Sequence, residues 1–551
     1  MDVAELARDI AELRAANAEL GAKVSKLEEE REQYRKLYQQ MLEKAKKLER
    51  GLLGQKAERL PPSDAQLSLQ LLAGLLGERE AALDDEPEAE AEDSGAQPEQ
   101  PEPERERPKP KPTGRRRMPK NLPVVKIELI PDDVVEKGLE NFERVGEEVI
   151  STIERRPSSF VICEVHRPKF LLKERDRLEP ADFSIAEPIA LPIERGLAGP
   201  GLLADTIVRR HADHQPFHRL EKTYAREGLE LAKSTMCTWH KTMAGLCEPL
   251  IDAMWKDALA VAPYLCTDAT GVLVRDKERC RRGHFWVVVA PTRHVLFRYT
   301  PKHNGAAVDS MLKDYKGVLV ADAHSVYDHL YEDGSVTEAG CWAHARRYFF
   351  KAMLSEPEQA REALALIGKL FKLERKSTGL SAKQRKKQRQ EKSRPVVDAF
   401  FDWCDARVDT VLDETPLAKA IGYVRNQREA LHTFLRDGRI PLHNNGSERE
   451  LRRQAVGRKN WLFVGNDDAG QVNATFVTLI ASCEMHGIEP WAYLRDLFCL
   501  LPEWPRHRVL ELCPARWKET LEDELAQQRL AADPFRQITL GAFDAQLDDQ
   551  A

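Results

Sequence analysis

The 551-residue sequence lacks any run of about 18 uncharged apolar residues, the length that a membrane-spanning helix requires. It also lacks the basic start and apolar stretch of a secretory signal, because it opens with the acid-bearing segment MDVAELARDI. Ten cysteines are present, but no two of them form a Cys-x-x-Cys pair. Scattered cysteines of this kind favour reduced thiols over a disulfide framework or a zinc site. We therefore expect a cytoplasmic protein with no membrane partner and no zinc.

A positive net charge is also absent, since the formal net charge is −6. Phosphate binding needs clustered Lys and Arg, so this balance alone argues against a nucleic-acid partner. The acids, however, are concentrated in DDEPEAEAED and in the C-terminal tail, whereas RERPKPKPTGRRRMPK, KQRKKQRQEKSR and RELRRQAVGRK are dense in cations. Each basic run can equally be a solvated surface, so charge by itself leaves the partner open.

The N-terminal segment carries a heptad pattern in which one seam includes Leu6, Leu13, Leu20 and Leu27. The other seam includes the polar residue Asn17, which can pair with its twin in a parallel two-stranded coiled coil. This pattern predicts a homodimer. The alternative is a helix that packs against the body of its own chain.

Two helices with a turn between them are predicted in PFHRLEKTYAREGLELAKSTMCTWHKTMAGL. The turn falls at Gly228, and Ser234 can cap the second helix. Such a pair resembles a helix-turn-helix, whose second helix lies in a major groove of DNA. A purely structural helical hairpin is an equally good interpretation.

The region from Tyr264 onward predicts the order strand, strand, strand, helix, strand. Asp268 lies inside the first of these strands, and Asp322 lies at the end of the last. In the ribonuclease H-like fold these two strands are neighbours, so we expect the two aspartates to meet at the sheet surface. Taken alone, each aspartate can be read as a turn cap at a strand end.

Neighbouring carboxylates raise one another's pKa unless a cation lies between them. Oxygen ligands suit Mg²⁺ or Mn²⁺, and two such ions about 3.5–4 Å apart serve phosphoryl transfer. The third acid is Glu448, which we place in the first turn of a helix that begins near Asn445. Glu448 can also be an acid that merely suits the helix dipole. The residues expected to bind DNA follow it: Arg449, Arg452, Arg453, Arg458 and Lys459.

Several motifs resemble those of the insertion sequence 66 family of transposases: TDATG, GHFWVVV, GCWAHARRYF, DGRIPLHNNGSERELRRQAVGRKNWLFVG and EPWAYLRDLF. The resemblance runs from about RRRMPKNLP to CLLP and includes the N-terminal coiled coil in type. It implies an Asp-Asp-Glu transposase whose ribonuclease H-like core is interrupted by a helical insertion. The matching acids are Asp268, Asp322 and Glu448. The partners that it implies are the DNA ends of a mobile element, target DNA and, in many members, accessory proteins of the same element.

Cys341 and His344 have a Cys-x-x-His spacing that several related transposases carry after the second acid. We interpret the pair as support for the site, with buried packing of both as an equal alternative. Trp342 and Trp461 can stack on unpaired bases, although core packing is the commoner fate of tryptophan.

The sequence departs from the family in two places. Family members usually carry a zinc-binding segment with paired cysteines after the linker, whereas here only Cys163 and His166 are present. Four zinc ligands cannot be assembled from them. Ala323 and His324 follow Asp322 where the family more often has glycine and tyrosine, which leaves the local geometry open.

Together these observations predict a multidomain α+β protein. The expected segments are a coiled coil (1–50), a short helical segment as a candidate DNA-binding unit (51–83), a disordered linker (84–122), a β-rich module in place of the zinc segment (123–200), helix-turn-helix-like helices (201–255), the N-terminal portion of the catalytic core (256–350), a helical insertion (351–439), the C-terminal portion of the core (440–502) and a C-terminal tail (503–551). The expected function is metal-dependent strand cleavage and strand transfer by a bacterial, nucleoid-associated transposase. The rivals are an inactive DNA-binding remnant or regulator, and a metal-dependent nuclease without strand transfer.

Overall fold

The computed structural model describes residues 23–24 and 122–541, apart from 157–158, 174–182, 195, 277–278 and 354. The chain divides into two compact units, 1–94 and 95–551. Apart from Lys23 and Val24, which are helical, the predicted coiled coil lies outside the described residues, as do the segment 51–83 and nearly all of the linker. All the elements named here belong to the second unit.

The first sheet is the predicted β-rich module. It comprises β1 (Val124–Glu128), β2 (Phe142–Arg156), β3 (Ser159–Leu172) and β4 (Ser184–Ile185), with α3 (Asp132–Lys137) and η1 (Leu139–Asn141) between β1 and β2. The order is β1-β3-β2, with β1 parallel and β2 antiparallel to β3, and β4 on β3. Val125 and Ile127 are buried in its core, whereas Val124 is 40 % exposed, because alternate strand residues face opposite sides.

Three helices follow the module: α4 (Pro200–His211), α5 (Phe217–Arg226) and α6 (Lys233–Val261). The predicted turn at Gly228 is confirmed, since its φ of 87° suits glycine. The predicted cap at Ser234 is wrong, because α6 begins at Lys233 and Ala232 is its N-cap. One face of α6 is buried in the main hydrophobic core, so the helix pair is part of the body of the protein.

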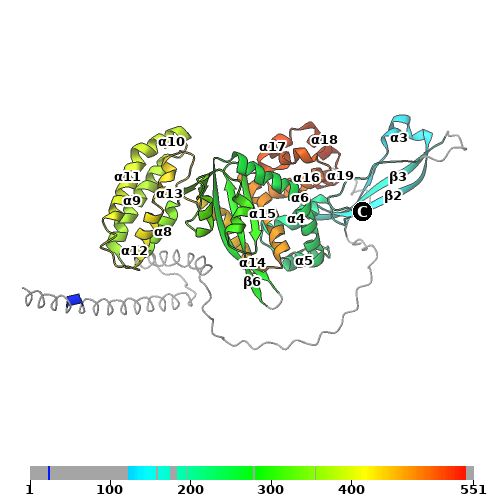
Figure 1. The fold of residues 1–551 in the computed structure, drawn as a ribbon. Coiled ribbons are helices and arrows are strands. Elements are labelled where there is room, and N and C mark those ends of the chain that lie inside the picture. Colours follow the sequence, from blue (N-terminus) through cyan, green and yellow to red (C-terminus); the bar gives the residue numbers. More distant parts are fainter. Residues whose placement is uncertain are drawn as a thin grey trace, which may run out of the picture. The chain divides into compact units, whose positions relative to one another are not determined.

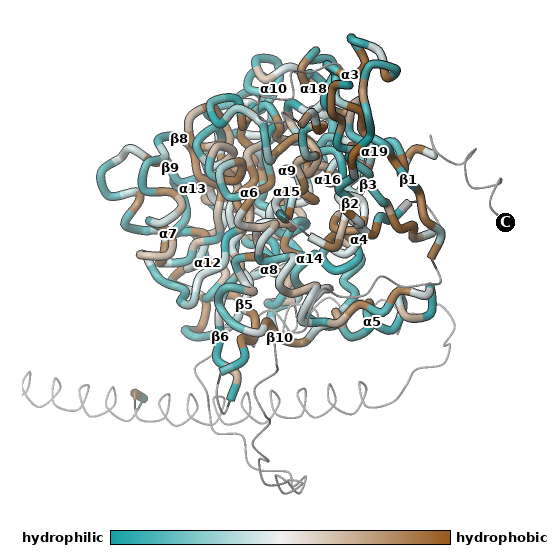
Figure 2. Tube along the Cα trace, turned by 90° about the vertical axis from the view of Figure 1, so that its right-hand side faces the viewer, coloured by the Kyte–Doolittle hydropathy of each residue, from teal (hydrophilic) through white to brown (hydrophobic). Residues whose placement is uncertain are grey.

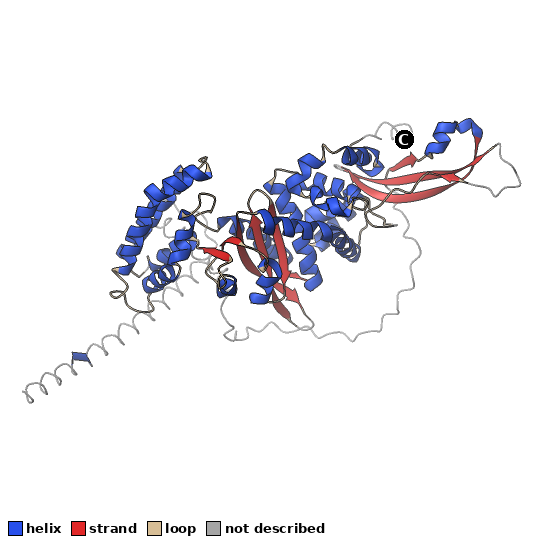
Figure 3. Cartoon of the chain, turned by 45° about the horizontal axis from the view of Figure 1, so that its top comes forward, coloured by secondary structure: helices blue, strands red, loops and turns tan. Residues whose placement is uncertain are grey.

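The central sheet comprises β5 (Tyr264–Arg275), β6 (Cys280–Ala290), β7 (His294–Thr300), β8 (Gly317–Val320), β9 (Val336–Ala339) and the short β10 (Phe463–Val464), with α7 (Gly305–Leu312) and η2 (Ser325–Leu330) on either side of β8 in sequence. Its order is β7-β6-β5-β8-β9, and β10 pairs with β5. β5, β6 and β7 are antiparallel, whereas β8, β9 and β10 run parallel to their neighbours. The predicted order of strands and helix is confirmed, and Figure 3 distinguishes this sheet from that of the β-rich module.

Both faces of the central sheet are covered by helices (Figure 1). Trp286, Val288 and Leu296 lie in one core cluster, and the alternating residues Val287 and Phe297 lie in the other. This near-continuous apolar pattern is what a strand buried on both faces requires.

Helices occupy nearly all of the chain from Trp342 to Leu435. They are α8 (Trp342–Ala352), α9 (Pro357–Lys376), α10 (Ala382–Gln388), the π-helix η3 (Arg389–Ser393), α11 (Arg394–Asp405), α12 (Pro416–Asn426), α13 (Arg428–His432) and η4 (Thr433–Leu435). Arg389 is fully buried and joins them by donating to Glu374 and to the carbonyls of Phe434 and Asp437. The chain then returns to the central sheet.

The remaining elements are α14 (Asn445–Trp461), β10, α15 (Asp467–Met485), α16 (Pro490–Leu500), η5 (Arg506–Leu512), η6 (Pro514–Arg516), α17 (Trp517–Thr520), α18 (Glu524–Ala532) and α19 (Pro534–Thr539). The interpretation of 503–551 as a tail is wrong as far as Gly541, because Trp517 and Leu530 are buried in the main core and Ile538 in that of the β-rich module. Within the described residues, no helix has the length and apolar character to cross a membrane.

Candidate active site

Asp268 and Asp322 are brought together by the parallel pairing of β5 with β8. Cys266 is opposite Val320 in the register of this pair. Asp268 and Asp322 each come two residues after this last pair, Asp268 still within β5 and Asp322 just beyond the end of β8. The negative charge of Asp322 raises the pKa of Asp268, as expected for adjacent carboxylates.

Burial is the main reason that the pKa of Asp268 lies well above its ordinary value, and Asp322 and then Glu448 raise it further. The backbone N–H of Ala269, which donates to Oδ1 of Asp268 across 2.7 Å, opposes the shift. Arg347 opposes it as well. The ionised form of Asp268 is therefore costly here unless positive charge is supplied nearby.

Glu448 lies in the first turn of α14, as predicted. Its Oε1 atom is 3.6 Å from Nε2 of His344 and 3.8 Å from a guanidinium nitrogen of Arg347. The same Oε1 atom is buried and accepts no hydrogen bond within the described part of the chain. One acceptor of this carboxylate is thus buried and unsatisfied beside His344 and Arg347.

Cys341 and His344 connect α8 to the start of α14. Cys341 is fully buried, and its Sγ accepts a hydrogen bond of 3.2 Å from the backbone N–H of Asn444. Burial raises the pKa of this thiol to about 11, so it stays protonated near neutral pH. Burial and then Arg347 lower the pKa of His344, although Glu448 opposes them, which favours a neutral imidazole beside the carboxylate.

Asn444 is a site residue that the sequence reasoning missed. Its side chain is fully buried, and Nδ2 donates to the carbonyl of Thr267 across 2.8 Å. The backbone carbonyl of Asn444 accepts hydrogen bonds from the backbone N–H groups of Ser447 and Glu448. An Asn that directly precedes an acid-bearing helix was the available signal in the HNNGSERE motif.

The acids fit a divalent cation by the chemistry of their donors. All three offer carboxylate oxygens, the ionised form of Asp268 is penalised by burial and by its neighbours, and Oε1 of Glu448 is a buried acceptor without a partner among the described residues. The described residues hold no compact group of three or more His, Cys, Asp or Glu side chains that could hold a metal ion as they stand. Asp268, Asp322 and Glu448 are therefore candidate ligands by the chemistry of their oxygens and not by a preformed geometry.

The five cations that follow Glu448 divide into two groups. Arg453 donates to both carboxylate oxygens of Glu484, at 2.8 and 2.7 Å, and to Glu450. Arg458 donates to the carbonyl of Gly271 across 2.6 Å. These two arginines hold α14 against α15 and β5, and their binding to DNA stays a prediction. The exposed cations of the set are Arg449, Arg452 and Lys459.

Stacking of Trp342 or Trp461 on bases is not supported by their surroundings. Trp342 is 1 % exposed and lies among Phe400, Phe401 and Phe434. Trp461 is 8 % exposed, with the guanidinium of Arg210 over its ring. Neither ring presents a face to a ligand, so the core-packing alternative is correct for both.

Cys163 and His166 lie on opposite faces of β3, because three positions separate them along the strand. Cys163 is buried among apolar residues, whereas His166 lies 3.3 Å from Glu147 and 3.5 Å from Glu164. The two side chains therefore cannot share one zinc ion, and the absence of zinc from this module stays a prediction.

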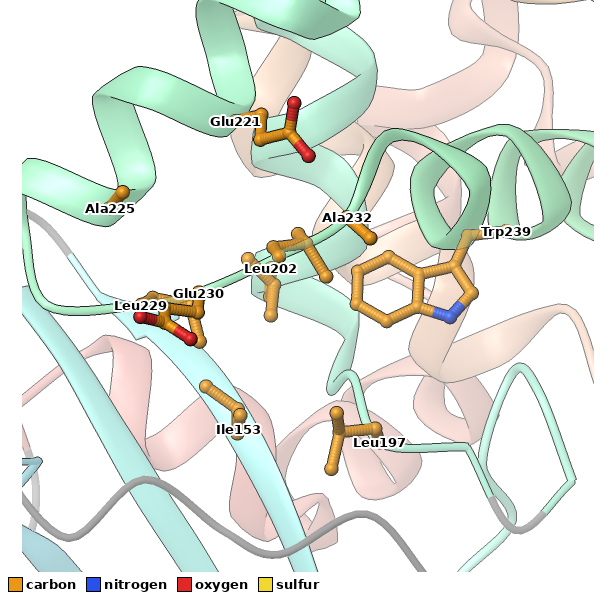
Figure 4. A pocket seen from close by; sticks show the side chains of 10 residues that line it. Ile153, Leu197, Leu202, Glu221, Ala225, Leu229, Glu230, Ala232 and Trp239 are labelled. Atoms are coloured by element: carbon orange, nitrogen blue, oxygen red, sulfur yellow. The ribbon is translucent and has the colours of Figure 1, made fainter. Parts of the chain in front are cut away.

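A separate pocket lies between β2, α4, α5 and the start of α6 (Figure 4). Its lining is mainly apolar, with Trp239 on one side and the carboxylates of Glu221 and Glu230 at its edge. None of the three candidate catalytic acids lines it. Its acids would repel a phosphate, so the pocket is not a site for the DNA backbone.

Comparison with known proteins gives three family matches along the chain. Residues 195–472 match the Transposase IS66 family, residues 478–515 match the IS66 C-terminal element, and residues 40–127 match a family described as Transposase C of IS166 homeodomain.

Related proteins come from Sinorhizobium fredii (strain NBRC 101917 / NGR234). The uncharacterized protein y4hP is 28 % identical over 503 residues, which cover 86 % of this chain and 88 % of the relative. The uncharacterized protein y4qI is 29 % identical over 392 residues, covering 68 % of this chain and 72 % of the relative. The transposase domain matches half of the chain, which confirms the resemblance seen in the sequence motifs. The chain therefore belongs to the IS66 family of transposases.

Proposed function

We propose that this protein is a transposase of the Asp-Asp-Glu type, which cleaves DNA strands at the ends of a mobile element and joins them to target DNA. The observation that carries the proposal is the convergence of Asp268, Asp322 and Glu448. The last paired residues of β5 and β8, Cys266 and Val320, each come two positions before an aspartate, and the charges of Asp322 and Glu448 both act on Asp268.

The sheet order supports a ribonuclease H-like core. The antiparallel strands β5, β6 and β7 are followed by a helix and then by the parallel strands β8 and β9. β8 pairs with the edge of β5 opposite β6, so the order across the sheet is β7-β6-β5-β8-β9. The helices between Trp342 and Leu435 then interrupt the core before α14 delivers Glu448. A fold by itself does not define an activity, so the proposed activity depends on the three acids.

Asp268, Asp322 and Glu448 would hold two Mg²⁺ or Mn²⁺ ions. When bound, such ions activate an attacking oxygen and stabilise the leaving oxygen of a phosphodiester. The chain's own contribution is to hold the carboxylates in place and to limit their contact with water. His344, as a neutral imidazole 3.6 Å from Glu448, orients that carboxylate, and Arg347 offsets part of the negative charge.

The reaction that these groups support has two steps of the same kind. In the first, water attacks a phosphodiester at the element end, and the 3′-oxygen leaves with a proton as a 3′-hydroxyl. In the second, that hydroxyl attacks a phosphodiester of the target, loses its proton, and displaces another 3′-oxygen. Each step forms one P–O bond and breaks one, so no oxidant or energy donor is needed.

DNA contacts are proposed for two surfaces of the chain. Arg449, Arg452 and Lys459 are exposed on α14, directly after Glu448. α5 and α6 present further exposed cations, in keeping with the helix-turn-helix interpretation: Arg219, Lys222, Arg226 and Lys233. We propose in addition that the N-terminal coiled coil makes a homodimer and that accessory proteins of the element assist, in the bacterial cytoplasm at the nucleoid.

The proposal is tested by Asp268→Asn, which keeps the shape of the side chain and removes its charge. Cleavage of element-end DNA in Mg²⁺ or Mn²⁺ should fall below detection, while binding of the same DNA changes less than about threefold. Wild-type cleavage by the variant would refute the assignment. The two rivals are separated by the products, since a nuclease gives cut strands without joined ones and an inactive remnant gives neither.

A further inference from the structure

One side of α8 points toward the candidate acids. Its residues are three or four positions apart in the helix and so share a face: His344, Arg347, Tyr348 and Lys351. Two contacts place this face at the site, because Oε1 of Glu448 is 3.6 Å from Nε2 of His344 and 3.8 Å from the guanidinium of Arg347. Figures 1 and 2 show α8 between α12 and α14, the helix that carries Glu448.

Tyr348 supplies an exposed aromatic ring on this face. It is 36 % exposed, and its ring stacks on that of Tyr423 in α12, with centroids 4.4 Å apart and planes 20° apart. Burial raises the pKa of Tyr423, and the charge of Asp322 contributes, so this tyrosine lies close to the acids. The stack therefore holds an exposed ring beside the site, which neither Trp342 nor Trp461 provides.

Lys351 adds positive charge to the same face. Its Nζ atom lies 5.9 Å from the centroid of the Tyr348 ring. Lys351 is exposed, and it forms no ion pair with a carboxylate in the part of the chain that the structure describes. The pKa of His344 is lowered mainly by burial, but Lys351 is among the cations that lower it further, so its charge acts at the site.

We propose that Tyr348 stacks on an unpaired or unstacked base next to the bond that is cut, and that Lys351 binds a phosphate of the same strand. This inference rests on the proposed transposase function and names a further DNA contact of that site. Aromatic rings stack on any base, because every base has a π-face, and a nearby cation suits the adjoining phosphate.

The distances along α8 agree with the spacing of nucleotides. Tyr348 comes four residues after His344, which is about 6 Å along the helix axis, and Lys351 comes about 10 Å after it. Neighbouring nucleotides of one strand are about 3.4 Å apart along a duplex. A strand whose phosphodiester lies at the acids therefore brings the one or two nucleotides beside it within reach of Tyr348.

A DNA strand suits this face better than a protein partner does. A strand that presents a phosphodiester to the three acids has to continue past them, and the face begins at His344, in contact with Glu448. A protein docked on Tyr348 and Lys351 would instead obstruct the approach to these acids. The alternative without any ligand is that the stack of Tyr348 on Tyr423 only packs α8 against α12.

The first test is photo-crosslinking of the full wild-type chain, without divalent ions so that the DNA stays uncut. An element-end duplex with unpaired bases around the cleavage position carries 5-iodouracil at one position at a time. Irradiation joins this base to an aromatic ring in contact with it. We expect adducts on Tyr348 from the one or two positions nearest the cut bond. Their absence at every flanking position would overturn the inference, and this result needs no variant to fold.

The second test measures the affinity of variants for the same DNA. Tyr348→Ala should weaken binding of the unpaired duplex about tenfold and that of a fully paired duplex less than about twofold. Tyr348→Phe keeps the ring and should bind like the wild type. Lys351→Ala should weaken both duplexes about threefold and lower the salt slope of binding by about one.

Matched controls lie on other surfaces of the chain. Arg346 is exposed on a different side of α8, where its guanidinium lies over the ring of Phe350. Phe183, just before β4, is 53 % exposed. Arg346→Ala and Phe183→Ala should bind both duplexes like the wild type, which shows that loss of any exposed cation or ring is not sufficient.

Thermal unfolding and light scattering of the variants separate the remaining outcomes. Lower stability of Tyr348→Ala at wild-type DNA affinity would show that the stack serves packing alone, and a changed oligomeric state at unchanged affinity would show a protein interface. Either result would overturn the inference while Asp268-dependent cleavage remains intact. Failure of the proposed function looks different, because the wild type then leaves element ends uncut, and this inference fails with it.

Discussion

The side-chain amide of Asn444 donates a hydrogen bond to the carbonyl of Thr267, and so ties the start of α14 to the β5 residue just before Asp268. The backbone N–H of Asn444 donates in turn to Cys341 at the start of α8. One buried residue thus sets the position of the helix that carries Glu448 relative to the strand that carries Asp268. Asn444 is a positioning residue, because it acts on the acids through the backbone.

Replacing Asn444 by alanine should lower cleavage more than it lowers DNA binding. The substitution leaves the buried carbonyl of Thr267 without its donor, which costs about 1–3 kcal/mol of stability. It also frees the start of α14, so saturation should need about tenfold more Mn²⁺. Cleavage rates over a Mn²⁺ series measure the metal requirement, and thermal unfolding measures the loss of stability.

Asn445→Ala is the matched control for Asn444→Ala, because Asn445 is the exposed neighbour. It should retain the wild-type Mn²⁺ requirement. If the two variants lose the same activity at all Mn²⁺ concentrations, the positioning role of Asn444 is wrong.

His344→Ala should reduce cleavage about 10- to 100-fold, the usual loss when a group that supports a metal ligand is removed. The physical reason is the 3.6 Å contact between His344 and Glu448, whose loss leaves the carboxylate with the longer, 3.8 Å contact to Arg347. His344→Gln should retain more activity than His344→Ala, because a polar side chain then remains beside the carboxylate of Glu448. Cleavage assays measure this difference, with DNA binding measured in parallel. Equal cleavage by the two variants would contradict the role of His344 in supporting Glu448.

The positions of Asp268 and Asp322 could be predicted because they depend on strand order, and strand order follows from the apolar runs between Tyr264 and Val320. Glu448 could be placed because the motif around it begins a helix. Both are local features of the sequence, combined with one rule about which strands are neighbours.

The surroundings of these acids could not be predicted, since they depend on contacts between distant segments. Arg453 is paired with Glu484, 31 residues away, and Asn444 with Thr267, 177 residues away. Ring burial at Trp342 depends on Phe400 and Phe434, which come from later helices. No spacing in the sequence indicates which of several arginines has a carboxylate beside it in the fold.

Deleting residues 1–50 should convert the protein from a dimer to a monomer. The reason is the heptad seam of Leu6, Leu13, Leu20 and Leu27, whose apolar side chains can be buried only against another helix. Light scattering on the truncated chain gives the mass directly. A truncated chain that remains a dimer would show that another surface holds the two copies together.

The purified protein should contain no stoichiometric zinc. Between Leu122 and Leu203 the sequence offers one cysteine and one histidine, Cys163 and His166, and they face opposite sides of β3. The module should therefore stay folded in the presence of a strong chelator, because apolar packing stabilises it. Elemental analysis that finds about one tightly bound zinc per chain, lost together with the module's structure, would refute this prediction.

Glu154 should make the protein less stable as the pH rises above about 5. This carboxyl is fully buried in β2, where Oε1 accepts from the backbone N–H groups of Arg155 and Leu202, and burial raises its pKa from 4.5 to about 8. Between these two values the folded chain keeps the proton that the unfolded chain has lost, so stability falls with increasing pH until the pKa of about 8 is passed.

Glu154→Gln carries no charge at any pH and should therefore unfold at nearly the wild-type temperature near pH 5 but several degrees higher near pH 9. Glu143→Gln, at an exposed position of the same strand, is the matched control and should follow the wild-type pH profile. Thermal unfolding from pH 5 to 9 measures the difference, and a constant gap between Glu154→Gln and the wild type across that range would show that the buried carboxyl is not the cause.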